Sequence, residues 1–238
     1  MASPYNLEMH TDCVNCPLRH DERFCDLSES AVEALDAAKF STTYPKGATL
    51  FVEGEMPRGV FILCSGKAKL TTSSSEGRTL IMKVTEPGEI LGASAAILGK
   101  PYEVSAETIE PTQVNFIRLP DFLDFLAKHP DACMRMAQQL SVKYQDAQRE
   151  VRSLGLSQTT SEKLARLILG WASEGEQTPK GLRVKVLLTH EEIGQMLGTT
   201  RETVTRLLGD LKRKRIIDVN GSNVYVTKRE ALSAMVSF

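Results

Sequence analysis

The stretch LTHEEIGQMLGTTRETVTRLLGDLKRKRIIDVNGSNVYVT, residues 188–227, predicts two short helices followed by a hairpin. Thr189 is followed three residues later by Glu192, the spacing of a capping box, so a helix is expected to begin there. Gly198 should end that helix, and DVNGSNVYV predicts a hairpin after the second one. Two short helices joined by a glycine-containing turn are typical of a DNA-binding helix-turn-helix, and the hairpin would be its wing.

The second of these helices, which Thr199 or Thr200 can cap, has two distinct faces. Arginine can donate two hydrogen bonds to guanine and glutamate can accept one from cytosine, so a face that carries both is predicted to read base edges. With about 100° of rotation per residue, one face holds Val204, Leu207, Leu208 and Leu211, and the other holds Arg201, Glu202, Thr205 and Arg206.

Further DNA contacts are expected from Thr189 and Thr200 at the two helix starts. Lys212 and Lys214 belong to the run KRKR, residues 212–215, whose positive charge suits phosphates. A solvated charged helix is the alternative interpretation. The cap, the turn, the separated faces and the wing together favour DNA binding over that alternative.

Charge is distributed unevenly along the 238 residues. Residues 160–238 contain 13 Lys and Arg against 9 Asp and Glu, a net charge of +4, whereas residues 1–159 contain 16 against 21, a net charge of −5. The basic C-terminal third favours a polyanion-binding module joined to a part with another role. The start, MASPYNLEMHTD, lacks the features of a signal peptide, and no window approaches about 18 apolar residues. We therefore expect a cytoplasmic protein without a membrane segment.

Residues 44–117 contain short β-rich runs separated by turn residues such as Gly54, Gly66 and Gly88. The runs are TLFVEG, GVFILCSG, KAKLTTS, TLIMKVT, EILGASA, EVSAET and QVNFIRL. Many short strands at this spacing predict an antiparallel sandwich or barrel of the jelly-roll kind. A short helix with Ser28 as its N-cap is expected ahead of them, in LSESAVEALDAAK.

A long helix is expected from about Asp131 to Leu154. A narrow heptad seam along it is what two helices need to pack side by side, so we predict a homodimer through this helix. The alternative is one amphipathic helix lying on its own barrel. The seam positions alternate in steps of three and four residues and are Cys133, Ala137, Leu140, Tyr144, Ala147, Val151 and Leu154.

Three of the five cysteines, Cys13, Cys16 and Cys25, lie within the stretch CVNCPLRHDERFC. A disulfide frame does not suit a cytoplasmic chain with an odd number of cysteines. A redox CxxC pair would be expected near a βαβ pattern, which the sequence lacks, so a thiol redox protein is a distant alternative. Ligands to a metal or an iron–sulfur cluster remain, and no catalytic residues are expected.

From about residue 27 to residue 238, the sequence resembles the superfamily of the cyclic-AMP receptor protein and FNR, which are bacterial transcription regulators. The similarity is carried by PKGATLFVEGE, GVFILCSGKAKL, GEILGASA and LTHEEIGQMLGTTRETVTRLL. It implies an α+β fold with an N-terminal cyclic-nucleotide-binding-like β jelly roll, a long dimerisation helix and a C-terminal winged helix-turn-helix. The domains would be a cysteine-containing segment at 1–26, a sensor barrel at 27–129, the dimerisation helix at 130–156 and the DNA-binding domain at 157–238.

The resemblance also implies the partners of the chain. These are double-stranded DNA with a palindromic operator near promoters, and RNA polymerase. RETVTR looks like the base-reading motif of the cyclic-AMP receptor branch, so Arg201, Glu202 and Arg206 carry over as base contacts. The FNR branch usually carries a different residue at the position of Arg201, so the resemblance favours a receptor-type operator.

Cyclic AMP is not expected as a ligand of the barrel. In the receptor branch, a glutamate directly after the glycine that matches Gly92 holds the ribose, and an arginine before Ser105 helps to hold the phosphate. Here Ala93 and Val104 stand at those two positions. A buried phosphate without a cation would lose charge-assisted hydrogen bonds worth roughly 1.5–3 kcal/mol each.

FNR-type oxygen sensors hold a [4Fe–4S] cluster on N-terminal cysteines ahead of this barrel. The resemblance therefore implies that Cys13, Cys16 and Cys25 bind such a cluster and make the regulator respond to oxygen, nitric oxide or redox state. The family's fourth cysteine is replaced here by Asn115. His20 is our first candidate for the missing ligand.

Other candidate ligands are His10, Asp12 and Asp21, with Cys64 and Cys133 more distant in sequence. Cys64 lies in an apolar run, where a small buried hydrophobe is the more common role of a cysteine. Zinc is the alternative to the cluster, because three cysteines and one histidine form an ordinary structural zinc set. The chain would then be a regulator that responds to another small ligand or to none.

Overall fold

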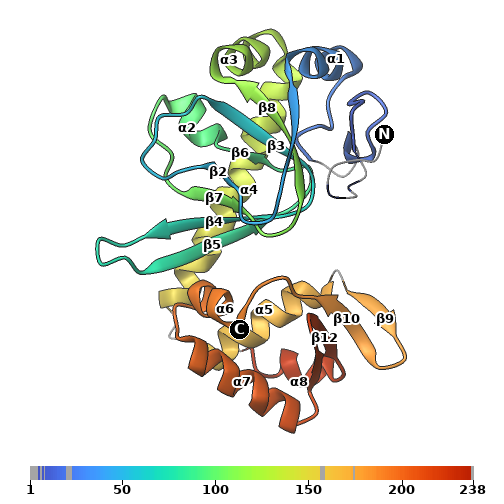
Figure 1. Cartoon of the computed structure of the whole chain (residues 1–238), viewed down its shortest axis with the longest axis vertical. Helices are drawn as coiled ribbons and strands as arrows, with labels where there is room; N and C mark the ends of the chain where they lie inside the picture. Colours follow the sequence, from blue (N-terminus) through green and yellow to red (C-terminus); the bar gives the residue numbers. More distant parts are fainter. Residues whose placement is uncertain are drawn as a thin grey trace. The chain divides into compact units, whose positions relative to one another are not determined.

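The computed structural model describes residues 5, 7, 9–19, 23–155, 159–173 and 175–236, and only the backbone of 149–155. The chain divides into two compact units, Met1–Arg149 and Glu150–Phe238, which are described separately (Figure 1). Within the described residues, no helix is both long and apolar enough to cross a membrane.

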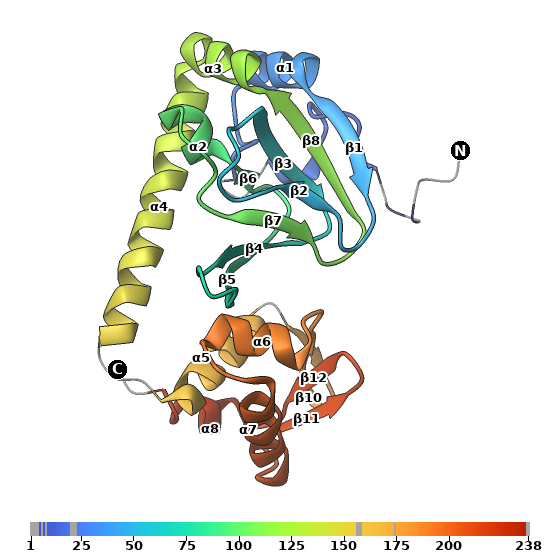
Figure 2. The same ribbon diagram turned by 60° about the vertical axis from the view of Figure 1, so that its left-hand side comes forward.

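The first unit is built on two four-stranded antiparallel sheets (Figure 2). One sheet has the order β1-β8-β3-β6 and the other the order β2-β7-β4-β5, which is the predicted sandwich of short strands. The strands are β1 (Phe40–Tyr44), β2 (Thr49–Phe51), β3 (Gly59–Ser65), β4 (Ala68–Ser73), β5 (Thr79–Thr85), β6 (Ile90–Leu91), β7 (Ser105–Thr108) and β8 (Thr112–Arg118).

Alternation along β3 divides the buried side chains of this unit into two groups. Phe61 and Leu63 belong to the core between the two sheets. Val60 and Ile62 point the other way and join a second core, under the N-terminal segment and the helices. Both faces of β3 are therefore covered, which explains why its sequence is almost continuously apolar.

Several helical elements accompany the sheets in the described part of the first unit. They are a 3₁₀ turn η2 (Pro17–Arg19), α1 (Glu29–Ala38), α2 (Ala93–Leu98), α3 (Leu119–Lys128) and the long helix α4 (Pro130–Gly155). The observed α4 matches the predicted long helix within one residue at each end. Ser28 precedes α1 as expected, although its side chain makes no capping hydrogen bond.

The prediction that the run EILGASA forms one strand is wrong. Its strand ends at Leu91 and helix α2 begins two residues later. Gly92 lies between them with a φ of 78°, a backbone conformation that glycine adopts without strain. The run is too short for its apolar pattern to distinguish strand from helix. Strand β1 was not predicted at all, because three of its five residues are exposed and show no alternation.

The second unit contains the predicted pair of helices and hairpin. Its four-stranded antiparallel sheet has the order β11-β12-β10-β9, so two strands before the helices extend the hairpin. The elements are α5 (Thr160–Ser173), β9 (Glu176–Thr178), β10 (Gly181–Lys185), α6 (His190–Leu197), α7 (Arg201–Arg213), β11 (Ile217–Asn220), β12 (Asn223–Val226) and α8 (Arg229–Ser233).

Candidate nucleic-acid interface and cysteine site

The predicted capping box is formed at the start of α6. The Thr189 hydroxyl accepts a hydrogen bond from the backbone N–H of Glu192 at 3.2 Å, and the Glu192 carboxylate accepts one from the N–H of Thr189 at 2.8 Å. Both bonds satisfy N–H groups that the first turn of a helix leaves unpaired. The start of α6 is therefore held by residues only three positions apart.

A tight turn joins α6 to α7. Gly198 ends α6 with a φ of 66°, and its N–H donates to the carbonyl of Gly194. Thr200, rather than Thr199, then caps α7 by accepting the N–H of Thr203 at 3.3 Å. The turn approaches α6 closely, because a Cβ added to Gly194 would lie 2.8 Å from the backbone oxygen of Thr199. Glycine at position 194 therefore sets how closely the two helices pack.

Helix α7 presents the polar face that the sequence predicts. Val204, Leu208 and Leu211 are buried in the core of the second unit. Its exposed face carries Arg201, Glu202, Thr205 and Arg206. This separation leaves four polar side chains exposed on one face of α7.

Two features at the start of α7 shape the chemistry of this face. Hydrogen bonds from the N–H of Glu202 itself and from the Thr200 hydroxyl hold the pKa of the Glu202 carboxyl below its usual value. Glu202 is therefore ionised at neutral pH and is a hydrogen-bond acceptor only. A pocket lined by Thr189, His190, Glu191 and Arg201 lies where the two helices begin.

His190 was not predicted as part of this face. Its Nδ1 lies 2.9 Å from the Thr205 hydroxyl, which also donates to the backbone carbonyl of Arg201 at 2.9 Å. These two bonds occupy most of the hydroxyl's capacity, so the Thr205 methyl group is the part left to face a base. Histidine and threonine are 15 positions apart, a separation that no local sequence pattern reveals.

The basic run after α7 is exposed, but its charges are not equivalent. The Lys212 amine lies 3.4 Å from the Asp218 carboxylate of the wing, and Arg213 pairs with Asp210. Lys214 is exposed at the C-cap of α7. Of the two lysines predicted to bind phosphates, Lys214 is the one with no acidic partner among the described side chains.

The N-terminal segment that carries the cysteines is fastened to the first unit at several points. The backbone N–H and carbonyl of His10 both pair with the Gln113 side chain of β8, at 2.8 and 2.7 Å. Phe24 is fully buried against Phe122 of α3, and Arg23 donates to the carbonyl of Pro87. The segment therefore covers the outer face of the β1-β8-β3-β6 sheet.

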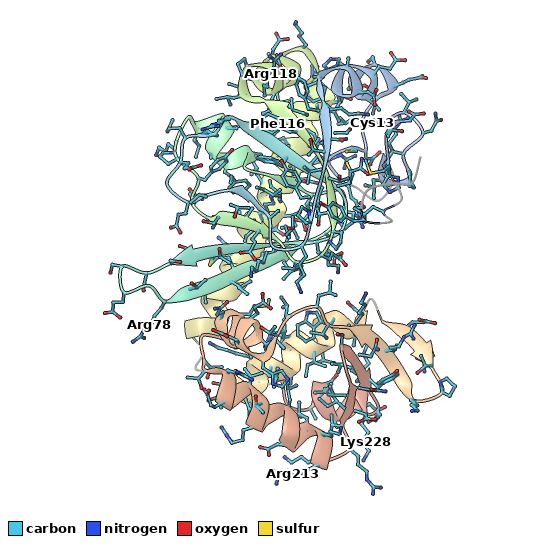
Figure 3. The ribbon with its side chains drawn as sticks, in the orientation of Figure 1. Cys13, Arg78, Phe116, Arg118, Arg213 and Lys228 are labelled. Atoms are coloured by element: carbon cyan, nitrogen blue, oxygen red, sulfur yellow. The ribbon has the colours of Figure 1, made fainter. Side chains whose placement is uncertain are left out.

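Cys13 is held between this sheet and α1 (Figure 3). Its N–H donates to the Asp36 carboxylate at 2.9 Å, and its Sγ accepts from the Lys39 amine at 3.3 Å. The Nδ2 of Asn115 also lies 3.6 Å from this sulfur, while the Oδ1 of Asn115 accepts from Ser41 at 2.7 Å. Asn115, which stands where the resemblance implies a fourth cysteine, therefore faces Cys13.

Three buried thiols of this part of the unit have raised pKa values. Burial raises the pKa of Cys13 to about 11, against the opposing charge of Lys39. Burial, and then repulsion from Cys13 and Cys16, raises the pKa of Cys25 to about 12. Burial raises the pKa of Cys64 as well, and Cys25, Cys13 and Cys16 add to that effect. Cys13 and Cys25 belong to one buried cluster.

The raised pKa values argue against a thiol redox pair. A reactive cysteine needs a substantial thiolate fraction and access to solvent. Cys13 and Cys25 are buried, with 8% and 9% of their surface exposed, and all five cysteines are unpaired. Metal ligation does not have this limitation, because binding the metal removes the thiol proton.

The structure tests several candidates for the fourth ligand. His20 and Asp21 lie outside the described residues. Asp12 caps its own loop by accepting from the N–H of Val14 and from both nitrogens of Asn15. In the part of the chain that is described, no three His, Cys, Asp or Glu side chains are arranged to hold a metal ion.

The predicted seam on α4 faces away from the barrel for most of its described length. Cys133, Ala137, Tyr144 and Ala147 are exposed, whereas Ala132 and Met136 are buried against the first unit. Leu140 is an exception because it is half-buried against that core. Val151 and Leu154 lie where only the backbone is described.

Ser105 and Glu53, which are both half-buried, are hydrogen-bonded to each other in the barrel. The Ser105 hydroxyl accepts the backbone N–H of Glu53 at 2.9 Å. The Glu53 carboxylate accepts from the Thr72 hydroxyl at 2.9 Å and from the N–H of Ser73 at 3.2 Å. The serine that would help to hold a phosphate is thus engaged with the backbone of an acidic residue.

Two family profiles match the chain on either side of α4. A cyclic nucleotide-binding domain matches residues 41–129, and a Crp-like helix-turn-helix domain matches residues 162–235. The chain belongs to the CRP/FNR family of transcription regulators. Members of this family bind DNA through the helix-turn-helix, so the polar face of α7 belongs to a DNA-binding domain.

Relatives and solved structures agree with this membership. A CRP-like cAMP-activated global transcriptional regulator from Mycobacterium tuberculosis is 26% identical over 211 residues, which cover 88% of this chain and 94% of the relative. A global nitrogen regulator from Synechocystis is 26% identical over 193 residues, or 80% of this chain and 86% of the relative. The structure of FixK2 from Bradyrhizobium japonicum has a TM-score of 0.74 at 20% identity, and covers 84% of this chain and 98% of FixK2.

These comparisons confirm three expectations. The chain has the predicted fold class, it belongs to the predicted superfamily, and it is a DNA-binding transcription regulator. Because the CRP/FNR relatives are regulators and not enzymes, the expectation that the chain has no catalytic activity is also confirmed.

The turn between α6 and α7 generates the first prediction. Gly194→Ala should destabilise the second unit by about 1–3 kcal/mol, because the added Cβ would overlap a backbone oxygen that cannot move without separating the helices. Urea unfolding followed by the fluorescence of Trp171, the single tryptophan, measures this change. Gly170→Ala on α5 is the matched control, since nothing lies within 4 Å of its added Cβ. It should be neutral or stabilising by up to about 1 kcal/mol. Equal unfolding midpoints for the two variants would contradict the prediction.

Proposed function

We propose that the protein is a dimeric regulator that reads a palindromic operator through α7 and responds to oxygen, nitric oxide or redox state through its N-terminal cysteines. The observation that carries the DNA-reading part is the exposed face of α7, where two arginines and an ionised glutamate stand together. RNA polymerase is proposed as a further partner, as expected for a regulator that binds near promoters.

The residue types on α7 specify the kind of operator. Arg201 and Arg206 can each donate two hydrogen bonds to guanine, and Glu202 can accept one from cytosine. We propose a half-site rich in G·C contacts, of the TGTGA type, repeated as an inverted pair. The pocket lined by Thr189 and Arg201 lies at the N-termini of both helices, where backbone N–H groups suit a phosphate.

Arg206→Ala is expected to reduce operator affinity by about 1–3 kcal/mol and to relax the preference at one base position. Lys214→Ala should instead weaken binding to all sequences alike and reduce the slope of affinity against salt, because Lys214 would contact phosphate only. Binding to a set of single-base operator variants at several salt concentrations distinguishes the two. An Arg206 variant with unchanged base preference would exclude it as a base contact.

The dimer proposal is supported by the exposed seam on α4. Tyr144 of the seam has 66% of its surface exposed, which is unusual for a large aromatic side chain on a helix. The seam lies beside the face that packs on the barrel, so a single chain leaves it uncovered. An operator with two-fold symmetry also requires a reader with that symmetry.

Tyr144→Asp should raise the dimer dissociation constant at least about tenfold, because it would bury an unpaired charge in the seam. Sedimentation measures the oligomeric state, and circular dichroism checks that the barrel remains folded. Gln138→Asp provides the control, since Gln138 is exposed on the side of α4 opposite the seam. If the Tyr144→Asp protein dimerises over the same range of protein concentration as wild type, the dimer seam lies elsewhere.

We propose that cyclic AMP is not the effector. The barrel carries Ala93 and Val104 in place of the two anchoring residues of the receptor branch. Ser105 remains, but its hydroxyl is engaged with the backbone N–H of Glu53. A phosphate without the arginine would also lose charge-assisted hydrogen bonds, so we do not expect the barrel to bind a cyclic nucleotide tightly.

The sensory role is assigned to the cysteine segment, which touches the first turns of the dimerisation helix. The Asp26 carboxylate pairs with Arg135 of α4 at 2.7 Å, and the N–H of Ser28 donates to the Asp131 carboxylate at 2.9 Å. Both contacts follow directly after Cys25 in the chain. A change of state at the cysteines can therefore alter the position of α4, the element proposed to hold the dimer together.

The donor set suits an iron–sulfur cluster, which prefers thiolate ligands and takes its sensitivity to oxidants from its iron. Cys13, Cys16 and Cys25 would hold it. Zinc is the alternative, because the same thiolates could hold a single zinc ion.

Anaerobic purification tests the sensory role. The wild-type chain should contain iron and sulfide, and its operator affinity should change at least about tenfold after exposure to air, within the range of allosteric couplings. Cys16→Ser should contain little iron and should show the same affinity before and after air. The sensory role would be refuted if the wild-type protein were colourless and contained stoichiometric zinc. It would also be refuted if operator affinity changed neither on exposure to air nor on the Cys16→Ser substitution. The segment would then be structural.

A further inference from the structure

Cys64 is distant in sequence from the three cysteines of the N-terminal segment. It is more than 35 positions from Cys25 and lies within the apolar strand β3. It is buried, with 5% of its surface exposed, and its Sγ–H points toward the Ile62 carbonyl of the same strand at 3.7 Å. A cysteine in this setting would ordinarily be a small apolar filler.

The register of β3 and β8 determines which face Cys64 occupies. Ile62 pairs with Asn115, and Leu63 pairs with Val114. The register then shifts, so that Ser65 pairs with Gln113 and Cys64 is the extra residue of a bulge. Side chains two apart on a strand share a face, so Cys64 follows Ile62 onto the outer face of the sheet.

That outer face is where the cysteine segment docks. Asn115 reaches the Cys13 sulfur at 3.6 Å, and Gln113 holds the backbone of His10. Cys64 stands on the neighbouring strand beside these two residues and thus lies beneath residues 10–13. The mutual charge effects among Cys64, Cys13, Cys16 and Cys25 agree with this placement.

We infer that Cys64 completes, with Cys13, Cys16 and Cys25, a four-thiolate site for a polynuclear iron–sulfur cluster. The inference rests on the proposed function and supplies its missing ligand. Asn115 stands on β8 where the resemblance implies a fourth cysteine. Cys64, on the paired strand β3, supplies that thiolate instead. Each thiol loses its proton to solvent as its sulfur binds iron, and the Lys39 amine stabilises the Cys13 thiolate.

The donor set suits a cluster. An iron–sulfur cluster prefers thiolate ligands and binds each thiolate to its own iron, so four cysteines match its requirements.

The experiment compares full-length variants that differ from wild type at one residue. Wild type, Cys64→Ala and Leu63→Val are reconstituted with ferrous iron and sulfide under anaerobic conditions, and iron, sulfide and visible absorption are measured per chain. Leu63 provides the matched control, because it is the buried neighbour of Cys64 on β3 and belongs to the core between the two sheets. Leu63→Val should match wild type, while Cys64→Ala should bind less than about half the iron or lose it to a chelator about tenfold faster.

Two further variants separate the possible failures. Cys64→Ser keeps the volume of the side chain, and circular dichroism of both Cys64 variants checks that the barrel is folded. Cys16→Ser should lose its iron whatever the role of Cys64. If Cys16→Ser loses iron while folded Cys64→Ala and Cys64→Ser keep wild-type iron and wild-type chelator resistance, the cluster stands and the assignment of Cys64 is overturned. If wild type binds no iron and sulfide, the proposed cluster fails together with this inference.

Discussion

The pairing of β3 with β8 is the interaction on which the first unit depends, because both faces of this strand pair are used. On one face, Phe61 and Val114 fill the core between the two sheets. On the other, Ile62 packs under the helices, while Asn115 and Gln113 hold the N-terminal segment. A slip of one residue in this register would exchange the two sets of side chains and would place the polar ones in the core. The barrel and the cysteine site therefore cannot vary independently of each other.

The DNA-binding unit was predicted from the sequence in detail because its signals are local. The capping box joins residues three apart, Gly198 ends its helix through its own backbone, and the faces of α7 follow from helical periodicity. The pair His190–Thr205 was missed because it joins two helices across a turn. Local chemistry was thus enough to predict the helices and the face on which each residue lies. The contacts between the helices could be identified only from the folded structure.

The cysteine site shows the opposite balance. The sequence identified Cys13, Cys16 and Cys25 from their spacing, but the placement of Cys64 depends on a bulge in β3 and on a segment that docks from far away in the chain. The role of the polar residues of β8 could not be predicted from the sequence either. Gln113 and Asn115 alternate with Val114 and Phe116, as solvent-facing residues of a strand do, yet both are buried. Their partners, His10 and Cys13, are more than 100 positions away. Long-range pairing, rather than weak local preference, limited what the sequence could predict.

The way Gln113 binds the N-terminal segment has a consequence for how that segment can change. The amide of Gln113 receives the N–H of residue 10 and donates to its carbonyl, as the peptide group of an adjacent strand would. Both bonds use the backbone of His10, so this attachment does not depend on which side chain stands there. Any residue with a backbone N–H can occupy the position, and only proline would remove one of the two bonds. The segment is therefore free to diversify at its docking point during evolution while the cysteines that follow keep their place against the sheet.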